Sequence, residues 1–328
     1  MKIAKRLLAM LLVVASIFSL CACGMTKEEK AYKEEVENAV GIYPKWAETT
    51  VFYEIFVRSF ADSNGDGIGD FKGIEENLDY LEELGIGAIW LMPMMESTTY
   101  HGYDVVDYYS PNPDYGTMED FDSLVEECHK RDIKVIIDFV VNHSSSSNEW
   151  FTTALADENS KYRDYYFIEE TIPVDETDET YSYWRQDEGT GLYYYAHYDT
   201  IMPDLNYNNQ ELRDEIKNVA TFWLEHDIDG FRLDGAKEID TDINVTLDWW
   251  SEFTNEVASV KKDAFIVGEN WTTSYVEVGR YYEAMPSSFD FILADSILSM
   301  ARGQYVDIVS DMNVMRERYQ LKVDSNDV

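Results

Sequence analysis

The strongest constraint on the fold is an alternation of short, continuously apolar runs with amphipathic segments, which begins near residue 51. The run "IGAIWLMP" (86–93) follows "FKGIEENLDYLEELG" (71–85), in which apolar residues recur at the spacing of one helical face. The run "KVIIDFVVNH" (134–143) likewise follows "MEDFDSLVEECHKRD" (118–132). Strands that are apolar throughout are buried on both faces, so the pattern predicts a parallel sheet covered by helices.

This alternation predicts six strands, near residues 51, 87, 134, 229, 264 and 289. Residues 144–203 interrupt it, because they are polar, rich in Tyr and without clear periodicity, and we interpret them as a small subdomain inserted after the third strand. The expected fold class is therefore α/β, a TIM (β/α)8-type barrel built from residues 46–143 and 204–328. A doubly wound open sheet is the alternative.

The expected barrel is incomplete, with about six strands. No seventh or eighth strand is predicted in the sequence, and the barrel segments are shorter than the roughly 250 residues of a typical barrel. We therefore expect a chain truncated at its C-terminus. Because an open barrel exposes strand edges, we expect residues 24–328 alone to be poorly stable and weakly active.

The N-terminus has the pattern of a secretory signal, with three basic residues before an apolar run over residues 7–20. The segment "LCAC" (20–23) resembles a bacterial lipobox, which implies cleavage before Cys23 and lipidation of that residue. Residues 1–22 would then be a lipoprotein signal peptide and residues 23–45 a charged tether. The expected location is the cell surface, with the membrane contacted through the lipid only. A plain signal peptide with incidental cysteines is the alternative.

Composition narrows the range of partners. The net charge of -38 argues against nucleic acid, because phosphate binding needs a basic surface, but it leaves neutral ligands open. Once the signal is removed and Cys23 is lipidated, Cys128 is the only free thiol, so we expect no disulfide framework. We expect a monomer.

The segment "GFRLDGAKE" (230–238) places an arginine and an acid in an otherwise apolar strand. Arg232 and Asp234 are two positions apart, so their side chains share one face of the strand. Burying charge is costly unless the charge is paired. A structural salt bridge is one explanation, and a functional site is the other.

Polar residues also end the two neighbouring predicted strands, with Asn142 and His143 on one side and Glu269 on the other. The carboxyl ends of barrel strands meet at one rim, where active sites lie. Adjacent strands are about 4.8 Å apart, so Asp234 and Glu269 can meet the separation of about 5–5.5 Å that retaining glycosidases need. Arg232, beside Asp234, would keep that acid ionised.

Five segments in the expected order resemble motifs of the alpha-amylase family of glycoside hydrolases (family 13). They are "YHGYD" (100–104), "DFVVNH" (138–143), "MPDLN" (202–206), "GFRLDGAKE" (230–238) and "VGEN" (267–270), and the resemblance covers roughly residues 46–300.

The resemblance implies roles for individual residues. Asp234 would be the nucleophile and Glu269 the general acid/base. Arg232 and His143 would bind near the cleaved bond. On the non-reducing side Tyr103 would stack on the sugar, with His101 and Asp104 lining the same subsite, while Asn142 would support the inserted subdomain. Lys237 and Glu238 would lie near the sugar across the cleaved bond, although a solvated loop pair is the alternative for these two residues.

The segment "DSNGDGIGD" (62–70) is a separate signal. Its oxygen-bearing side chains recur as they do at the start of an EF-hand loop, but the twelfth position is Gly73 rather than Glu, so this is not an EF-hand. The segment resembles the calcium loop that follows the first strand in many amylase-like enzymes. An acidic glycine-rich turn without an ion is the alternative. The implied ligands to a structural Ca²⁺ are Asp62, Asn64, Asp66, Asp70 and the carbonyl of Ile68.

One family motif is missing. The fourth motif, Asn-His-Asp or similar, follows the seventh strand, and no His follows residue 226 in this sequence. The expected function is that of an alpha-amylase, a retaining hydrolase that cleaves α-1,4-glucosidic bonds in starch-like glucans by double displacement. An oligosaccharide α-glucosidase and a non-catalytic, glucan-binding surface lipoprotein are the alternatives.

Overall fold

The computed structural model describes residues 44–314. The expected signal peptide, Cys23 and nearly all of the expected tether lie outside these residues. No helix between residues 44 and 314 is long and apolar enough to cross a membrane.

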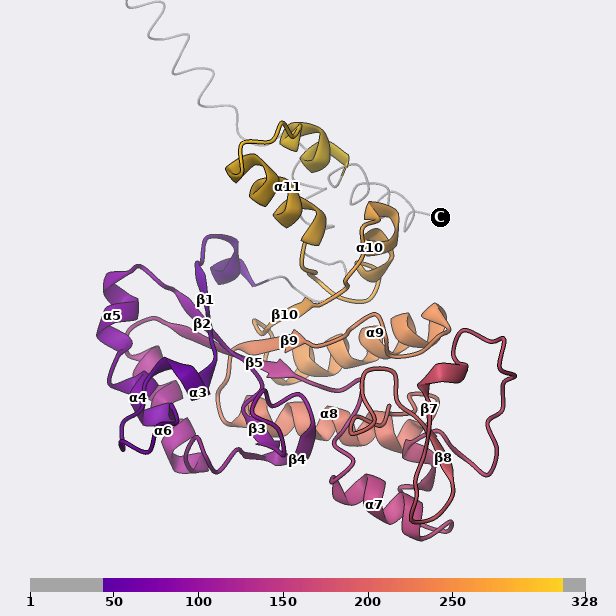
Figure 1. The fold of residues 1–328 in the computed structure, drawn as a ribbon. Coiled ribbons are helices and arrows are strands. Elements are labelled where there is room, and N and C mark those ends of the chain that lie inside the picture. Colours follow the sequence, from indigo (N-terminus) through magenta and orange to yellow (C-terminus); the bar gives the residue numbers. More distant parts are fainter. Residues whose placement is uncertain (1–43, 315–328) are drawn as a thin grey trace, which may run out of the picture. The chain divides into compact units, whose positions relative to one another are not determined.

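A five-stranded parallel sheet forms the centre of the fold (Figure 1). Its order, β1-β2-β5-β9-β10, follows the chain without a reversal, as in a barrel and unlike a doubly wound sheet. The sequence therefore predicted the fold class correctly, as an incomplete (β/α)8-type barrel. The strands are β1 (Phe52–Ile55), β2 (Ala88–Leu91), β5 (Lys134–Phe139), β9 (Gly230–Leu233) and β10 (Phe265–Gly268).

Helices connect successive strands. The helix predicted over residues 71–85 is divided in two around Asn77, whereas the helix predicted over residues 118–132 is continuous over Met118–His129. Asn148, Asn209 and Asp242 each cap the helix that follows them through a side-chain oxygen. The helices are η1 (Lys45–Glu48), α3 (Val57–Phe60), α4 (Phe71–Glu75), α5 (Leu78–Glu83), α6 (Met118–His129), α7 (Glu149–Ala156), α8 (Gln210–Glu225), α9 (Ile243–Val260), α10 (Tyr275–Tyr281) and α11 (Phe291–Ala301).

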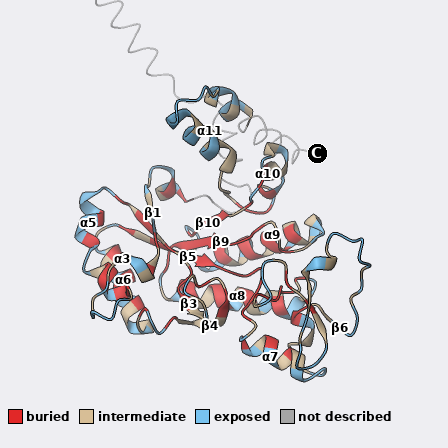
Figure 2. Ribbon diagram, viewed as in Figure 1, coloured by how far each residue is buried: buried red, intermediate tan, exposed pale blue. Residues whose placement is uncertain are grey.

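The sixth predicted strand is reduced to one bridge, in which Ser288 pairs in parallel with Gly268. The apolar residues that follow belong to α11, because Asp290 accepts a hydrogen bond from the Leu293 amide and caps a helix there. A short apolar run fits a strand or a helix equally well, and here the cap favours the helix. No residue of α11 is buried (Figure 2).

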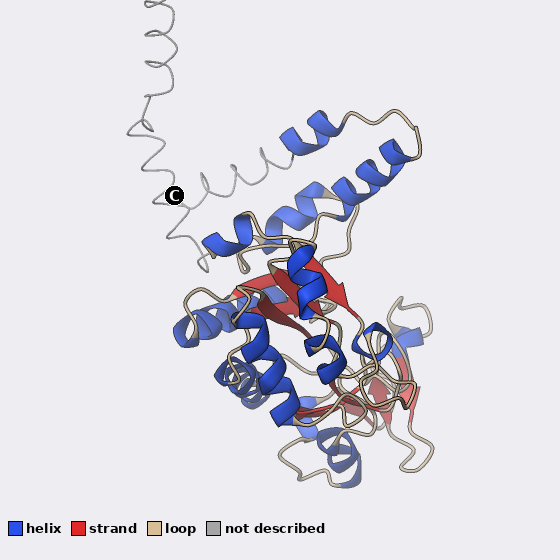
Figure 3. Cartoon of the chain, turned by 90° about the vertical axis from the view of Figure 1, so that its left-hand side faces the viewer, coloured by secondary structure: helices blue, strands red, loops and turns tan. Residues whose placement is uncertain are grey.

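The segment predicted as an insertion has its own secondary structure. Besides α7 it holds the short 3-10 helices η2 (Arg163–Tyr165) and η3 (Tyr181–Tyr183) and a three-stranded antiparallel sheet. An antiparallel bridge between His143 and Asp204 joins its two ends. Figure 3 separates these strands from the parallel sheet. They are β6 (Ile168–Glu169), β8 (Tyr193–Tyr195) and β7 (Trp184–Gln186); a further antiparallel pair, β3 (Met95–Ser97) and β4 (Val105–Pro111), lies between β2 and α6.

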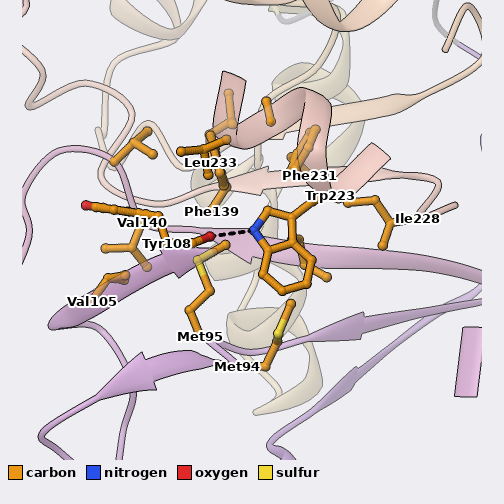
Figure 4. Packing of buried hydrophobic residues seen from close by; sticks show 14 of the residues in the cluster. Met94, Met95, Val105, Tyr108, Phe139, Val140, Trp223, Ile228, Phe231 and Leu233 are labelled. Carbon is orange, nitrogen blue, oxygen red and sulfur yellow. Dashed lines mark hydrogen bonds between the residues drawn. The ribbon is translucent and has the colours of Figure 1, made fainter. Parts of the chain in front are cut away.

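The main core lies between the sheet and its helices. Trp223 of α8 is fully buried and donates a hydrogen bond from its indole N–H to the carbonyl of Tyr108, 2.8 Å away (Figure 4). Phe139 and Phe231, from adjacent strands, pack with ring centroids 4.8 Å apart. Cys128 is a free, buried thiol of this core. The core thus fixes β5 and β9, whose ends carry the candidate site.

Candidate active site

Arg232 is the centre of a cluster of three acids. Its Nη1 lies 2.8 Å from Asp138 Oδ1 and 2.6 Å from Asp234 Oδ1, and its Nη2 lies 2.8 Å from Glu269 Oε2. The acids come from β5, from the end of β9 and from the end of β10, which are three adjacent strands. The register pairs Asp138 directly with Arg232, so both side chains point to the same face of the sheet. The structure therefore brings together the three strand ends that the sequence singled out.

Burial decreases across the cluster. The side chain of Asp138 is 0% exposed, that of Asp234 is 11% exposed and that of Glu269 is 22% exposed. Glu269 is thus the acid most accessible to a ligand. Burial raises the pKa of Asp138 well above its usual value, and Arg232 only partly opposes this effect.

Asp234 and Glu269 are held in place by backbone hydrogen bonds between strands. The amide of Asp234 donates to Phe139 O (3.2 Å), and the amide of Glu269 donates to Leu233 O (2.9 Å). The amide of Gly235 donates to Glu269 Oε2 (3.1 Å). Burial raises the pKa of Asp234, while Arg232 and a hydrogen bond with Glu269 lower it. The two acids are therefore direct neighbours at one rim.

His143 joins this rim to the segment that carries Tyr103. Its Nε2 lies 2.9 Å from the carbonyl oxygen of Tyr103, and its Nδ1 lies 3.0 Å from Asn142 Oδ1. Burial lowers the pKa of His143 to about 4, because a charged imidazole is poorly solvated there. Tyr103 is partly buried, and its pKa is raised by burial and by the nearby charge of Asp138. His143, which follows β5, is therefore in direct contact with the backbone of Tyr103.

Asp104 and His101 have defined partners near Tyr103. Asp104 is fully buried, and its oxygens accept hydrogen bonds from Ser97 Oγ (2.5 Å), from the Thr98 amide (3.1 Å) and from two threonine hydroxyls. These bonds lower its pKa despite its burial. His101 accepts a hydrogen bond from the Tyr103 amide (3.2 Å). Asp104 thus holds the loop 97–99 against the subsite.

Lys237 and Glu238 form an ion pair, with Nζ and Oε1 3.3 Å apart and both side chains partly exposed. Asn142 donates a hydrogen bond from its side chain to the carbonyl of Glu238 (2.5 Å), and its own carbonyl accepts from the Leu205 amide (2.9 Å). Asn142 therefore links the loop after β9 to the segment that returns from the insertion.

The sequence predicts no role for two residues of this region. Asp138 is the first residue of the segment "DFVVNH" (138–143), and a single acid inside the apolar run "KVIIDFVV" indicates that it has a charged partner. Tyr198, from the inserted segment, has its ring centroid 5.3 Å from that of His143. No periodic pattern in residues 144–203 distinguishes it from the other tyrosines there.

The predicted calcium loop is a turn organised by side chains. Asp62 accepts hydrogen bonds from the amides of Asn64, Gly65 and Gly67, which lower its pKa. The side chains of Asn64 and Asp70 converge, with Nδ2 and Oδ2 3.5 Å apart.

The donor set of this loop fits Ca²⁺, which prefers carboxylate, amide and carbonyl oxygens. Between residues 44 and 314, however, no group of three or more His, Cys, Asp or Glu side chains is already arranged to hold a metal ion. A cation at this loop would therefore rely on the Asn64 side chain and the Ile68 carbonyl beside its acids.

Two cavities lie away from the acid pair. One, of about 470 Å³, lies in the inserted segment and is lined by Phe151 and Tyr194 among others. The other, of about 530 Å³, lies between the C-terminal ends of α6 and α8 and includes His129 and His226. Neither is lined by Asp234 or Glu269. The candidate active site is therefore defined by the contacts among its residues and not by either of these cavities.

Comparison with known proteins identifies the family to which this chain belongs. The family described as "Alpha amylase, catalytic domain" matches residues 54–326. The chain belongs to the alpha-amylase family. It is 44% identical to Alpha-amylase 3 of Dictyoglomus thermophilum over 280 residues, which are 85% of this chain and 55% of that protein. It is also 44% identical to an oligo-1,6-glucosidase of Bacillus cereus over 196 residues, which are 58% of this chain and 35% of that protein.

Among solved structures, the alpha-amylase from H. orenii superposes with a TM-score of 0.75 at 44% sequence identity. The match covers 82% of this chain and 57% of that one. This chain therefore spans a little over half the length of its alpha-amylase relatives, and the partial barrel is a member of their fold.

Proposed function

We propose that the protein is a retaining glycoside hydrolase that cleaves α-1,4-glucosidic bonds in starch-like glucans. The observation that carries this proposal is the shared contact of Asp234 and Glu269 with the two terminal nitrogens of Arg232. Contact with a single guanidinium keeps the two carboxyl groups close together, which favours a retaining enzyme, with its carboxyl groups about 5–5.5 Å apart, over an inverting one, in which they stand about 6.5–9.5 Å apart.

The reaction then has two steps. Asp234 attacks the anomeric carbon and forms a covalent glycosyl ester, while Glu269 gives its proton to the departing glycosidic oxygen. In the second step Glu269 takes a proton from water, which attacks the same carbon and releases Asp234. Arg232 stabilises the ionised nucleophile against its burial. Tyr103 offers an aromatic face to the sugar, and Asp104 and His143 hold the segment that carries it.

We also propose that Ca²⁺ binds the loop at residues 62–70 as a structural ion. Asp62, Asn64, Asp66, Asp70 and the Ile68 carbonyl would hold it, and its charge would offset the acids of the loop. Asp70 also caps α4 by accepting from the Gly73 amide (2.6 Å), so order in the loop supports the helix that follows.

A second candidate is an oligosaccharide α-glucosidase, because the chain is as similar to an oligo-1,6-glucosidase as to an alpha-amylase over the residues that match. The third is a glucan-binding protein without activity. Products separate the three: starch gives a ladder of maltooligosaccharides with an endo-acting amylase, mainly glucose with a glucosidase, and no new reducing ends with a binding protein.

The test uses the purified chain, Asp234→Asn and the matched exposed control Asp263→Asn. We expect starch hydrolysis with the α-anomer as the first product by proton NMR, and a loss on the order of 1,000-fold or more in Asp234→Asn only. Hydrolysis that gives the β-anomer first, or that survives in Asp234→Asn, would contradict the double-displacement proposal.

A further inference from the structure

Tyr198 is an exposed aromatic residue in a part of the chain that the proposed mechanism does not use. It lies between β8 and Asp204, and 45% of its surface is exposed. Solvent exposure of a large aromatic side chain is informative when the side chain faces a candidate site. Tyr198 does so, because its ring lies against His143.

The hydroxyl of Tyr198 reaches the backbone that joins the two acids. A Cβ atom added to Gly235 would lie 2.6 Å from that hydroxyl oxygen. Gly235 directly follows Asp234 and donates its amide to Glu269. Its φ of 50° and its missing side chain thus leave space that the phenol of Tyr198 occupies.

Tyr198 and Tyr103 belong to different segments beside the acids. The carbonyl of Tyr103 lies 2.9 Å from His143 Nε2, whereas the hydroxyl of Tyr198 lies against Gly235, which directly follows Asp234. Gly235 begins the loop that carries Lys237 and Glu238. Since Tyr103 belongs to the proposed donor side, Tyr198 lies toward the loop proposed to meet the sugar across the cleaved bond.

The backbone around Tyr198 is held by hydrogen bonds, whereas its hydroxyl forms none with the described part of the chain. The amide of His197 donates to Asp204 Oδ1 (3.0 Å), and the amide of Met202 donates to Asp199 O (2.9 Å). Within residues 44–314 no protein group forms a hydrogen bond with the Tyr198 hydroxyl. An ordered tyrosine with an unpartnered hydroxyl can offer a sugar both a packing surface and a hydrogen bond.

We infer that Tyr198 contacts the sugar on the leaving-group side of the cleaved bond and makes the enzyme selective for a sugar at that position. The inference rests on the proposed function, because it needs a glycosidic bond between Asp234 and Glu269. In the second step the same position receives the acceptor, so Tyr198 also favours a sugar over water as acceptor.

The experiment compares two substrates that differ only in the leaving group. Maltotriose has a sugar leaving group, whereas α-maltosyl fluoride replaces it with fluoride, which cannot contact Tyr198. For Tyr198→Phe we expect kcat/KM for maltotriose to fall about 3- to 10-fold, the effect of one uncharged hydrogen bond, with the value for the fluoride unchanged. Transfer to added maltose, relative to hydrolysis, falls by a similar factor.

Tyr80→Phe is the matched control, because Tyr80 lies in α5 and is 52% exposed. Tyr80→Phe should leave kcat/KM unchanged for both substrates. If Tyr198→Phe lowers kcat/KM equally for both substrates, the role of Tyr198 is structural and the inference is wrong. If Tyr198→Phe lowers kcat/KM for neither substrate, the inference is also wrong. Loss of all activity in Asp234→Asn, with the unaltered chain active, tests the proposed function separately.

A measurement that needs no turnover completes the test. With 3-fluorotyrosine placed only at position 198, maltotetraose should shift the fluorine NMR resonance, whereas the same label at position 80 should not respond. A shift at position 198 from a chain that does not hydrolyse starch would support the inference while contradicting the proposed hydrolysis. The absence of a shift at saturating maltotetraose would overturn the inference.

Discussion

At the scale of single residues, the cluster around Arg232 has more negative than positive charge. Three carboxyl groups contact one guanidinium, and Asp138 is the most deeply buried of them. Burial raises the pKa of Asp138, so the folded protein binds this proton more tightly than the unfolded chain does. Its stabilisation is fully present below the unfolded pKa of about 3.9 and is lost as pH rises through the folded pKa.

Asp138→Asn removes this titration while it keeps the shape of a protonated acid. We expect the free energy of unfolding to fall less steeply between pH 5 and pH 8 than in the unaltered chain, by up to about 1.4 kcal/mol per pH unit. Urea unfolding at pH 5 and at pH 8 measures this change in the free energy of unfolding, with Asp263→Asn as the exposed control. A loss of about 3–5 kcal/mol at both pH values would instead show that Asp138 is the ionised partner of Arg232.

The sequence predicted the residues that follow simple rules of alternation. Arg232, Asp234 and Glu269 were found because strand side chains alternate and because barrel strand ends converge. The sequence predicts no role for Asp138, although this residue begins the motif "DFVVNH" (138–143), because its neighbours in the strand are apolar and do not show which partner it has. The sequence does not single out Tyr198, because its position depends on the fold of residues 144–203, where apolar residues recur at neither helical nor strand spacing.

At the scale of elements, the pairing of β9 with β10, in which Gly230 is opposite Phe265, leaves no space for a side chain at Gly230. Its φ is 148°, and a Cβ atom there would lie 1.9 Å from the Phe265 carbonyl oxygen. Gly230→Ala should therefore push two central strands apart and cost about 3 kcal/mol or more. Gly191→Ala is the control, because that glycine also has a positive φ but no atom within 4 Å.

The control should lose about 1 kcal/mol, from backbone strain alone. Urea unfolding of both variants gives the comparison. Equal losses would mean that backbone conformation, and not the contact between β9 and β10, determines the requirement for glycine at position 230.

Short or irregular elements are harder to predict than the strands of the central sheet. The five central strands lie at or within a few residues of their expected positions, because each is an apolar run between helices. The pair β3 and β4 was not predicted, since its irregular register leaves no strict alternation. Near residue 289 the apolar residues fit a strand or a helix equally well, and the hydrogen bond that caps the chain at Asp290 favours the helix.

At the scale of the whole molecule, the excess of acidic residues opposes folding. The net charge of -38 produces self-repulsion that a bound cation would reduce. The loop at residues 62–70 is a position where such a cation would act on more than one element. At the end of this loop Gly69 and Asp70 donate their amides to Arg58 O (2.8 Å) and Ala61 O (2.9 Å). The next residue, Phe71, donates its amide to Tyr115 O (2.9 Å).

Calcium should therefore raise the Tm of the whole chain, and a chelator should lower it. At a free Ca²⁺ concentration 100 times Kd, binding to the folded state adds about 2.7 kcal/mol, which for a chain of this size is a shift of several degrees. Two controls separate a site from simple screening of charge: NaCl at the same ionic strength, and Asp62→Asn in the presence of Ca²⁺. The calcium proposal requires that both give a clearly smaller shift, because screening needs no particular ligand, whereas coordination needs the oxygens of Asp62. If NaCl or Asp62→Asn reproduces the full shift, the loop is an acidic turn, and its stability comes from the hydrogen bonds of Asp62 to the backbone alone.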